Sequence, residues 1–278
     1  MGDRAFYRHY LLLAVPMILQ NAITNLVSFL DNIMVGQLGT EQMSGVAIVN
    51  QLIFVYNLAI FGAVSAASIF GAQYFGNGDH RGHMHSFRFK LYATLLVSGL
   101  TMLLLLTKGS DLISLYLTDT VGNGATDVAL QYGKQYLVIM LVGLVPFAVN
   151  QAYATNIKET GQTLVPMLAS FVAVGTNAVL DYLLIFGVGP FPELGVTGAA
   201  LATVIARYVE AVIVVFWAHR NREKNRYLEG AYRGFGIPVS ELKTILIKGL
   251  PLMFNEVLWA AGMTTVTQCY SVRGLDVV

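Results

Sequence analysis

Two carboxylates stand alone in long uncharged stretches of this chain. Asp31 is the only Asp, Glu, Lys or Arg over residues 9–40. Asp181 is the only such residue over residues 160–192. An ionised carboxylate in hydrocarbon costs about 2.5–3.5 kcal/mol even on lenient insertion scales, so such groups usually face a bundle interior or a watery cavity. Both acids are therefore the first candidates for function.

An amide side chain lies close to the second acid in the sequence. Asn177 and Asp181 are four residues apart, so on a helix they share one face. If Asp31 joins them, the two carboxylates repel each other, and the pair is expected to accept a proton near neutral pH. A sodium ion could satisfy the same oxygens, with the Asn177 amide carbonyl as a further ligand.

The composition indicates the class of protein that must position these groups. Hydrophobic residues make up 55% of the chain and charged residues 12%, which does not fit a soluble domain. The net charge is +1, so electrostatics give no argument for nucleic-acid binding. We expect an all-α polytopic membrane protein.

Apolar segments of about 20 residues or more predict the membrane helices. There are seven of them, at roughly 11–36, 43–73, 89–107, 128–157, 163–187, 196–219 and 242–270. Lys and Arg gather before the first segment, between the second and third, after the fourth, and between the sixth and seventh. Because cytoplasmic loops are enriched in these residues, the N-terminus is predicted to be cytoplasmic.

This topology places the two acids at a similar depth. The first and fifth segments both run outward, and Asp31 and Asp181 lie far along them, in the outer half of the membrane. The alternative interpretation is that each acid is an interfacial residue that reaches the outer headgroups. Matched depth and the nearby Asn177 favour a shared site.

A weak internal repeat relates the first segment to the seventh. AVPMILQN aligns with GLPLMFNE when Pro16 is laid on Pro251. The shift corresponds to six spans, an even number, so both copies would point the same way, as in transporters built from two parallel halves. The second half would then need five more helices. We therefore expect an incomplete chain, with a six-helix lobe at 1–219, a basic cytoplasmic linker at 220–241 and the start of a second lobe at 242–278.

Three stretches carry a resemblance to a known family. VPMILQNAITNLVSFLDNIMVGQLG, AASIFGAQYFGNGD and TNAVLDYLLIFG resemble the multidrug and toxic compound extrusion (MATE) transporters, nearest the bacterial DinF-like branch. The resemblance implies a twelve-helix antiporter of two six-helix lobes, which exports amphipathic, often cationic drugs in exchange for protons or sodium ions. This chain would be the N-terminal lobe plus the first helix of the C-terminal lobe.

The resemblance also implies roles for individual residues. The acid of the family's first helix falls on Asp31, and its fifth-helix NxxxD pattern falls on Asn177 and Asp181. In DinF-like members these side chains form the cation-coupling site. The family's helix-bending proline falls on Pro16. Proline removes a backbone donor, which offers the first helix a place to bend when the acids are neutralised.

Other polar residues in the spans have open interpretations. Glu256 is a lone charge in the seventh segment and is a candidate for a second cation or substrate site, against a structural hydrogen-bonded acid. Arg207 and Glu210, three apart in the sixth segment, are expected to pair with each other. Five amides could line a cavity or simply bond across helices: Gln51, Asn57, Asn150, Gln151 and Asn156.

The histidines do not indicate a metal site. His80, His83 and His85 follow Asp79 in what we expect to be a cytoplasmic loop, and no further ligands accompany them. GNGDHRG is better interpreted as a turn. The single cysteine allows no intrachain disulfide. We expect no resident metal, no cofactor and no catalytic residue.

Together these features predict a cation-coupled antiporter, driven by H⁺ or Na⁺, in the bacterial inner membrane. Its partners would be the lipid bilayer and small amphipathic substrates, with no nucleic acid, and it would work as a monomer. A lipid-linked precursor flippase of related fold is the alternative, but it should line its cavity with more cationic residues, and Arg207 is the one that lies near the middle of a predicted span. An enzyme is not expected, because no clustered acid or HExxH motif occurs.

Overall fold

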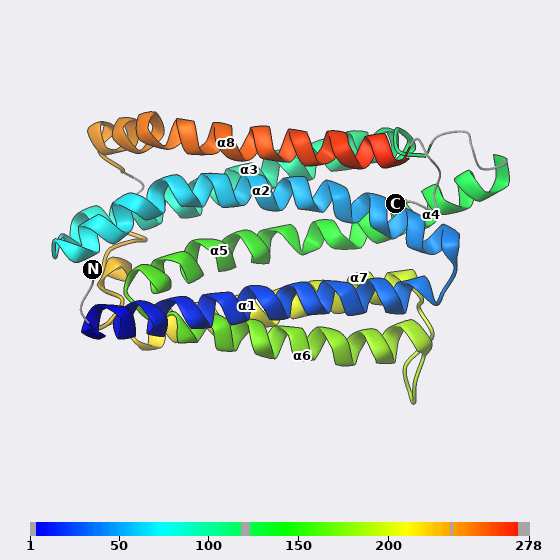
Figure 1. The fold of residues 1–278 in the computed structure, drawn as a ribbon, viewed down its shortest axis with the longest axis horizontal. Coiled ribbons are helices and arrows are strands. Elements are labelled where there is room, and N and C mark those ends of the chain that lie inside the picture. Colours follow the sequence, from blue (N-terminus) through cyan, green and yellow to red (C-terminus); the bar gives the residue numbers. More distant parts are fainter. Residues whose placement is uncertain (1–3, 118–122, 234–235, 272–278) are drawn as a thin grey trace.

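The chain folds as a bundle of long helices. A computed structural model describes residues 4–117, 123–233 and 236–271. The helices are α1 (Arg4–Gly36), α2 (Thr40–Gly76), α3 (His80–Ser114), α4 (Asn123–Val142), α5 (Leu144–Glu159), α6 (Leu164–Phe186), α7 (Val196–Arg220), a short 3-10 helix η1 (Arg226–Leu228), and α8 (Val239–Ser271). Figure 1 shows helices α1 to α8 lying roughly along the long axis of the molecule. The predicted all-α class is confirmed.

Most of these helices can cross a membrane. Within the described residues α1, α2, α3, α6 and α7 are each long and apolar enough, and α4 with α5 together make a sixth, bent span. Large apolar side chains such as Leu96, Leu103 and Phe216 are more than 60% exposed, as expected for a surface that faces lipid. The six-helix lobe is confirmed. The seventh predicted segment is indeed helical as α8, and its crossing of the membrane stays a prediction.

The fourth predicted span is not one continuous helix. Residues 128–157 were expected as a single segment, but α4 and α5 meet at Gly143 with a bend of 44°. Pro146 lacks the N–H that would bond to the carbonyl of Val142, so the helical ladder is interrupted there. Gly143 also allows close packing, since a Cβ would lie 3.1 Å from Val204 of α7.

The third span begins earlier than the apolar segment suggests. The histidines expected in a loop lie instead on the first turns of α3, because the turn between α2 and α3 comprises only residues 77–79. Asp79 caps α3, and its side chain accepts hydrogen bonds from the backbone N–H groups of Arg81 at 3.1 Å and Gly82 at 3.0 Å. Gly78 takes a positive φ of 71° in the turn.

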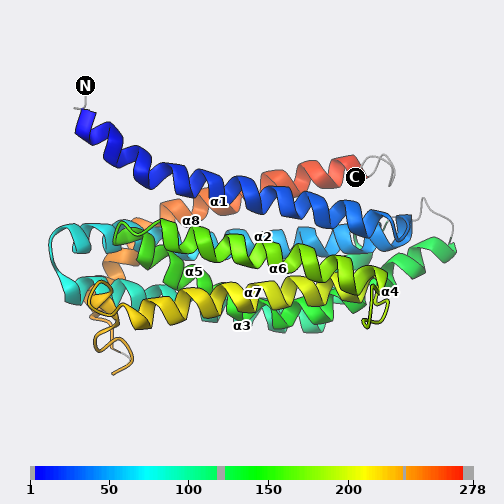
Figure 2. The same ribbon diagram turned by 90° about the horizontal axis from the view of Figure 1, so that it is seen from below.

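Helix α1 is attached to one side of the bundle. It packs mainly against α6, with smaller contacts to α2 and α7. Figure 2 shows that the N-terminal part of α1 leans away from the other helices, whereas its C-terminal part lies along them. Pro16 lies inside α1 and is buried, and the helix continues through it. Because proline has no N–H, the Leu12 carbonyl loses its helical partner at this point.

The interior is built from small residues and clusters of larger apolar side chains. Helices α6 and α7 approach so closely that a Cβ on Gly198 would lie 2.6 Å from the carbonyl oxygen of Leu184. Such close contact is typical of membrane helices, whose association depends on packing rather than on exclusion of water. The largest buried cluster is centred on α2, α4 and α7, with further residues from the other helices of the lobe.

The segment between α7 and α8 is held against α3 by one arginine. Arg88 is 6% exposed and donates hydrogen bonds to four backbone carbonyls of this segment. The acceptors are Gly230 at 2.7 Å, Ala231 at 2.8 Å, Gly236 at 2.8 Å and Arg233 at 3.2 Å. The guanidinium group, with five donors in a planar fork, can make this set of bonds where lysine could not.

Candidate functional site

Helices α1 and α6 run parallel and in a fixed register. Gln20 Nε2 donates a hydrogen bond to Ser170 Oγ at 2.7 Å, across a sequence separation of 150. Asp31 and Asp181 are separated by the same amount, 181 − 31 = 150. Parallel helices of equal rise keep this offset along their length. Asp31 therefore lies opposite Asp181, eleven residues further along the two helices and about 16 Å from the pair of Gln20 and Ser170.

The register brings the predicted acid pair together. The carboxyl groups of Asp31 and Asp181 are close enough to interact with each other. Asp181 is fully buried, Asn177 is 4% exposed, and Asp31 is partly exposed. The interfacial interpretation is disfavoured for Asp181, because its side chain is enclosed by helices. Its use in cation coupling stays a prediction.

The buried part of this site lacks protein partners. Neither carboxylate oxygen of Asp181 has a hydrogen-bond partner of acceptable geometry, although the Asn177 side chain lies beside it. The Asn177 amide nitrogen is likewise buried without a partner. Among the described residues, no basic nitrogen lies within 4.0 Å of either acid. A buried carboxylate left in this state is costly, so the site favours a ligand that supplies positive charge.

Two neighbours were not found from the sequence. Tyr136 of α4 is 4% exposed, interacts electrostatically with both acids, and contacts Thr203 of α7. Its hydroxyl donates to Asn50 Oδ1 at 3.3 Å. A tyrosine and a threonine are common in membrane helices, and only their tertiary position marks them. The sequence offered no signal except their location in apolar segments.

The chemistry available here is that of hard oxygen ligands. An ionised carboxylate only accepts hydrogen bonds, so two in contact need a shared proton or a cation between them. Carboxylate oxygens, an amide carbonyl and hydroxyl groups are the ligands that bind such cations in proteins. The arrangement fits reversible binding of H⁺ or Na⁺. The amide carbonyl of Asn177 is one such oxygen ligand.

Two further predicted residues lie away from this pair. Pro16 lies on α1, four residues before Gln20 and fifteen before Asp31. Glu256 lies on α8, but its side chain is outside the described part of the structure, so its assignment stays a prediction.

The amide candidates divide into two groups. Asn156 is fully buried, donates to the carbonyl of Ala152 at 2.8 Å, and accepts from Lys90 Nζ at 3.3 Å. It therefore bonds within the bundle, which was the alternative to lining a cavity. For the remaining four the choice stays open: Gln51, Asn57, Asn150 and Gln151. Of these, Asn57 and Asn150 each have a buried side-chain oxygen without a described partner.

The expected pair between Arg207 and Glu210 does not form. In the described chain no ion pair joins them within 4.0 Å. Arg207 donates to the carbonyl of Gly143 at 3.4 Å and lies 5.1 Å from the centre of the Phe147 ring. Glu210 accepts a hydrogen bond from Ser170 Oγ at 2.5 Å. The prediction was wrong because the break between α4 and α5 exposes a carbonyl to Arg207, while α6 supplies Glu210 with a hydroxyl donor.

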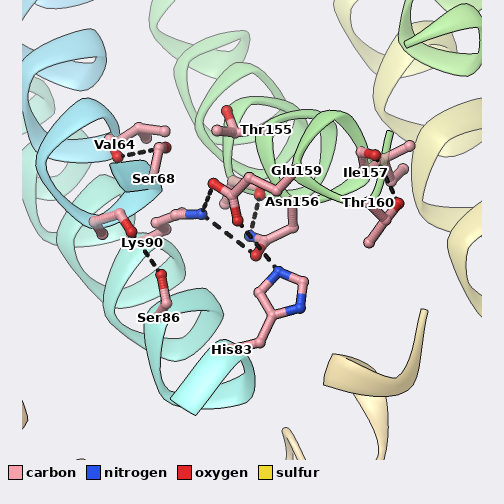
Figure 3. Close-up of polar contacts among 12 residues, drawn as sticks. Val64, Ser68, His83, Ser86, Lys90, Thr155, Asn156, Ile157, Glu159 and Thr160 are labelled. Carbon is pink, nitrogen blue, oxygen red and sulfur yellow. Dashed lines mark hydrogen bonds and ion pairs between the residues drawn. The ribbon is translucent and has the colours of Figure 1, made fainter. Parts of the chain in front are cut away.

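A second buried polar cluster lies near the opposite end of the bundle, where α3 begins and α5 ends. Lys90 Nζ forms an ion pair with Glu159 Oε1, and His83 Nε2 lies 3.2 Å from Glu159 Oε2 (Figure 3). Lys90 is fully buried, His83 is 2% exposed, and the Glu159 side chain is 5% exposed. We refer to Lys90, Glu159, His83 and Asn156 as the inner cluster, and to Asp31, Asp181 and Asn177 as the outer acid site.

A glycine on α2 makes room for the inner cluster. A Cβ at Gly71 would lie 2.2 Å from Glu159 Oε2 and 3.0 Å from Ser86 Oγ. Ser86 in turn donates to the carbonyl of Ala67 at 2.8 Å, which ties α3 to α2. The cluster therefore joins α2, α3 and α5. In contrast to the outer acid site, its carboxylate is supplied with both a cation and a hydrogen-bond network.

Comparisons with known proteins agree with this fold. A family model described as MatE matches residues 16–183, more than half of the chain. A probable multidrug resistance protein NorM of Thermotoga maritima is 26% identical over 266 residues, which are 95% of this chain and 54% of the relative. A protein of the same name from Rhizobium meliloti is 30% identical over 224 residues, 80% of this chain and 46% of the relative.

A solved structure shows the same architecture. It is described as the outward-facing conformation of a multidrug resistance MATE family transporter of the MOP superfamily, and it superposes with a TM-score of 0.78 at 23% identity. The match covers 92% of this chain and 54% of that one. The chain thus spans about half the length of the curated relatives it matches. Placement in the DinF-like branch stays a prediction. With its matching sequence and fold, the chain belongs to the MatE family of MATE transporters, which are not enzymes.

Proposed function

We propose that this chain is the cation-binding half of an antiporter that exports amphipathic, cationic small molecules in exchange for H⁺ or Na⁺. The observation that carries the proposal is the outer acid site. Asp181 is fully buried, lies against Asp31, and has no described hydrogen-bond partner or positive neighbour. A side chain kept at such cost inside a membrane helix usually serves an ion pathway.

Coupling follows from what a bound cation does to α1. With both acids ionised, repulsion between Asp31 and Asp181 opposes close packing of α1 against α6. A proton or sodium ion removes that repulsion, so α1 can pack differently. Pro16 gives the helix a weak point at which to bend, since the Leu12 carbonyl has no helical donor. Cation and substrate then compete because each favours a different position of α1.

Substrate export and membrane location belong to the same proposal. The relatives named above are called multidrug resistance proteins, which supports drugs or toxic metabolites as substrates. We infer a location in the inner membrane with a cytoplasmic N-terminus, a monomer as the working unit, and a lobe–linker–lobe order with boundaries near residues 219 and 241. A lipid-linked precursor flippase is not favoured, because those relatives are drug-resistance proteins.

Transport in vesicles tests the proposal. The product of the complete gene would be placed in proteoliposomes, and efflux of a cationic fluorescent dye would be followed under an imposed pH gradient or an imposed sodium gradient. Asp31→Asn should reduce gradient-driven efflux about tenfold or more, because the neutral amide cannot exchange a cation. One of the two gradients alone should drive export in the parent protein.

A matched control separates coupling from folding. Asp111 is 69% exposed and belongs to an ion pair with Lys108 at 3.3 Å on the surface of α3. Asp111→Asn makes the same chemical change away from the site and should leave efflux unchanged. Retained gradient-driven efflux in well-folded Asp31→Asn protein would refute the coupling role.

A further inference from the structure

A hydrogen-bonded chain ties α1 to the interior of the lobe at a second level. Gln20 Nε2 donates to Ser170 Oγ at 2.7 Å, and Ser170 Oγ donates to Glu210 Oε1 at 2.5 Å. The three residues come from α1, α6 and α7. Ser170 is 5% exposed, and Glu210 also interacts with the buried side chain of Asn150 on α5. One half-exposed helix is thus connected to the three helices behind it.

The Ser170 hydroxyl fixes the direction in which these hydrogen bonds are donated. A serine hydroxyl has one proton to donate and two lone pairs to accept. An ionised Glu210 can only accept, so it takes the Ser170 proton and leaves the Ser170 oxygen free to accept from Gln20. A hydrogen bond to a charged acceptor is stronger than one between neutral groups. Glu210 therefore orients Ser170 to hold Gln20.

The groups around Glu210 offset part of the cost of burying its carboxylate. Lys158 of α5 and Arg207 of α7 both interact with it electrostatically, although neither forms an ion pair within 4.0 Å in the described chain. Asn150 and Ser170 are its polar neighbours on α5 and α6. Two positive groups at a distance stabilise the negative charge without occupying the oxygen that Ser170 reaches.

The position of the chain relative to Pro16 suggests its use. Gln20 lies four residues after Pro16, and Asp31 lies eleven residues after Gln20. The N-terminal part of α1 leans away from the bundle (Figure 2), and Gln20 lies at the middle of the helix. Much of the described surface of α1 is exposed and apolar, whereas Gln20 reaches a buried hydroxyl of the lobe. If α1 is held at Gln20 while its contact at Asp31 changes, the helix has to bend. Without the hydrogen bond at Gln20, the whole helix could slide along α6.

We propose that Glu210, through Ser170, is a positioning residue for transport that fixes α1 at Gln20 and makes the proline region the pivot of helix movement. The proposal rests on the proposed antiport function. It adds a role for three residues outside the outer acid site, which we call the relay: Gln20, Ser170 and Glu210.

Spin-label distances test the anchor directly. Cys269 would be replaced by serine in the product of the complete gene, and labels would be placed at Leu12 on α1 and Phe216 on α7, both more than 60% exposed. In nanodiscs, Ser170→Ala and Gln20→Leu should each broaden the distance distribution, and the two changes together should do no more than either alone. Gradient-driven efflux should fall about tenfold in each, the effect expected of one strong hydrogen bond.

The control is another hydroxyl on the same helix. Thr176 Oγ1 donates only to the carbonyl of Val172 within α6, at 2.8 Å, and Thr176→Val should change neither distances nor efflux. Unchanged distances in both relay variants would overturn the proposal, and so would broadened distances with full efflux. Because Gln20 is only partly buried, Gln20→Leu keeps the test valid if Ser170→Ala fails to fold.

The two proposals can fail separately. If Asp31→Asn retains cation-driven efflux, the antiport proposal fails, and the label distances still decide whether the relay holds α1. If the relay variants behave like the parent, Asp31 can still couple transport to the cation.

Discussion

The outer acid site and the inner cluster place carboxylates in similar surroundings and treat them in opposite ways. Asp181 and Glu159 are both buried between membrane helices. Glu159 is paired with Lys90 and His83, whereas the neighbours of Asp181 in the described chain are another acid, an amide and Tyr136, with no cation within 4.0 Å. Burial of charge alone therefore does not separate structure from function in this lobe. The set of partners does.

The physical reason is the cost of an unpaired charge. A buried ion pair that also satisfies its hydrogen bonds has little need of an outside ligand, and its main effect is to join the helices that carry it. An acid pair without a cation is an incomplete site, and its free energy falls when a proton or metal ion arrives. The comparison predicts that stability depends on the inner cluster and ion coupling on the outer acid site.

Breaking the inner cluster should have the largest effect. Lys90→Met removes the positive partner and leaves Glu159 buried and ionised beside His83, so we expect the free energy of unfolding to fall by about 3–5 kcal/mol. Thermal unfolding in detergent would measure it as a lower melting temperature. The double variant Lys90→Met with Glu159→Gln should recover much of the loss, because no unpaired charge remains. A single variant that melts like the parent would show that the pair is not structural.

Neutralising the outer acid site should reduce transport without reducing stability. Asp181→Asn removes a buried charge that has no described partner. The free energy of unfolding should therefore stay the same or increase by up to about 2 kcal/mol, and the melting temperature should stay the same or rise with it. Gradient-driven efflux should nevertheless be lost. Measuring both properties on one preparation sharpens the comparison, and a large loss of stability in Asp181→Asn would contradict it.

The sequence was sufficient to predict the acid pair because its signal is local. A lone acid in a long apolar stretch is visible without any contact information, and the NxxxD spacing places Asn177 and Asp181 on one helix face. The six spans follow from the same apolar stretches. The similar depth of Asp31 and Asp181 could then be inferred from the rise per residue of a helix and from the alternating direction of successive spans.

The relay and the inner cluster could not be predicted in this way, because their partners lie on different helices. Arg207 and Glu210 are three apart, so a local rule pairs them, but Ser170 and Gly143 from other helices compete successfully. His83 was predicted to lie in a loop because the first turns of α3 are polar, so the apolar pattern that marks the span begins only after them. The bend at Gly143 depends on close contact with α7, which no pattern within α4 or α5 reports.

Partly exposed charge pairs provide the smallest effect and complete the comparison. His85 Nδ1 lies 2.8 Å from Glu241 Oε2 and links α3 to the start of α8, with side chains 15% and 27% exposed. Water screens such a pair, so His85→Gln should lower the free energy of unfolding by less than about 1 kcal/mol. The exposed pair of Lys108 and Asp111 should contribute still less, and Lys108→Ala provides the reference. If His85→Gln destabilised the protein as much as Lys90→Met, burial would not be the property that ranks these pairs, and attachment of α8 to the lobe would have to explain the difference.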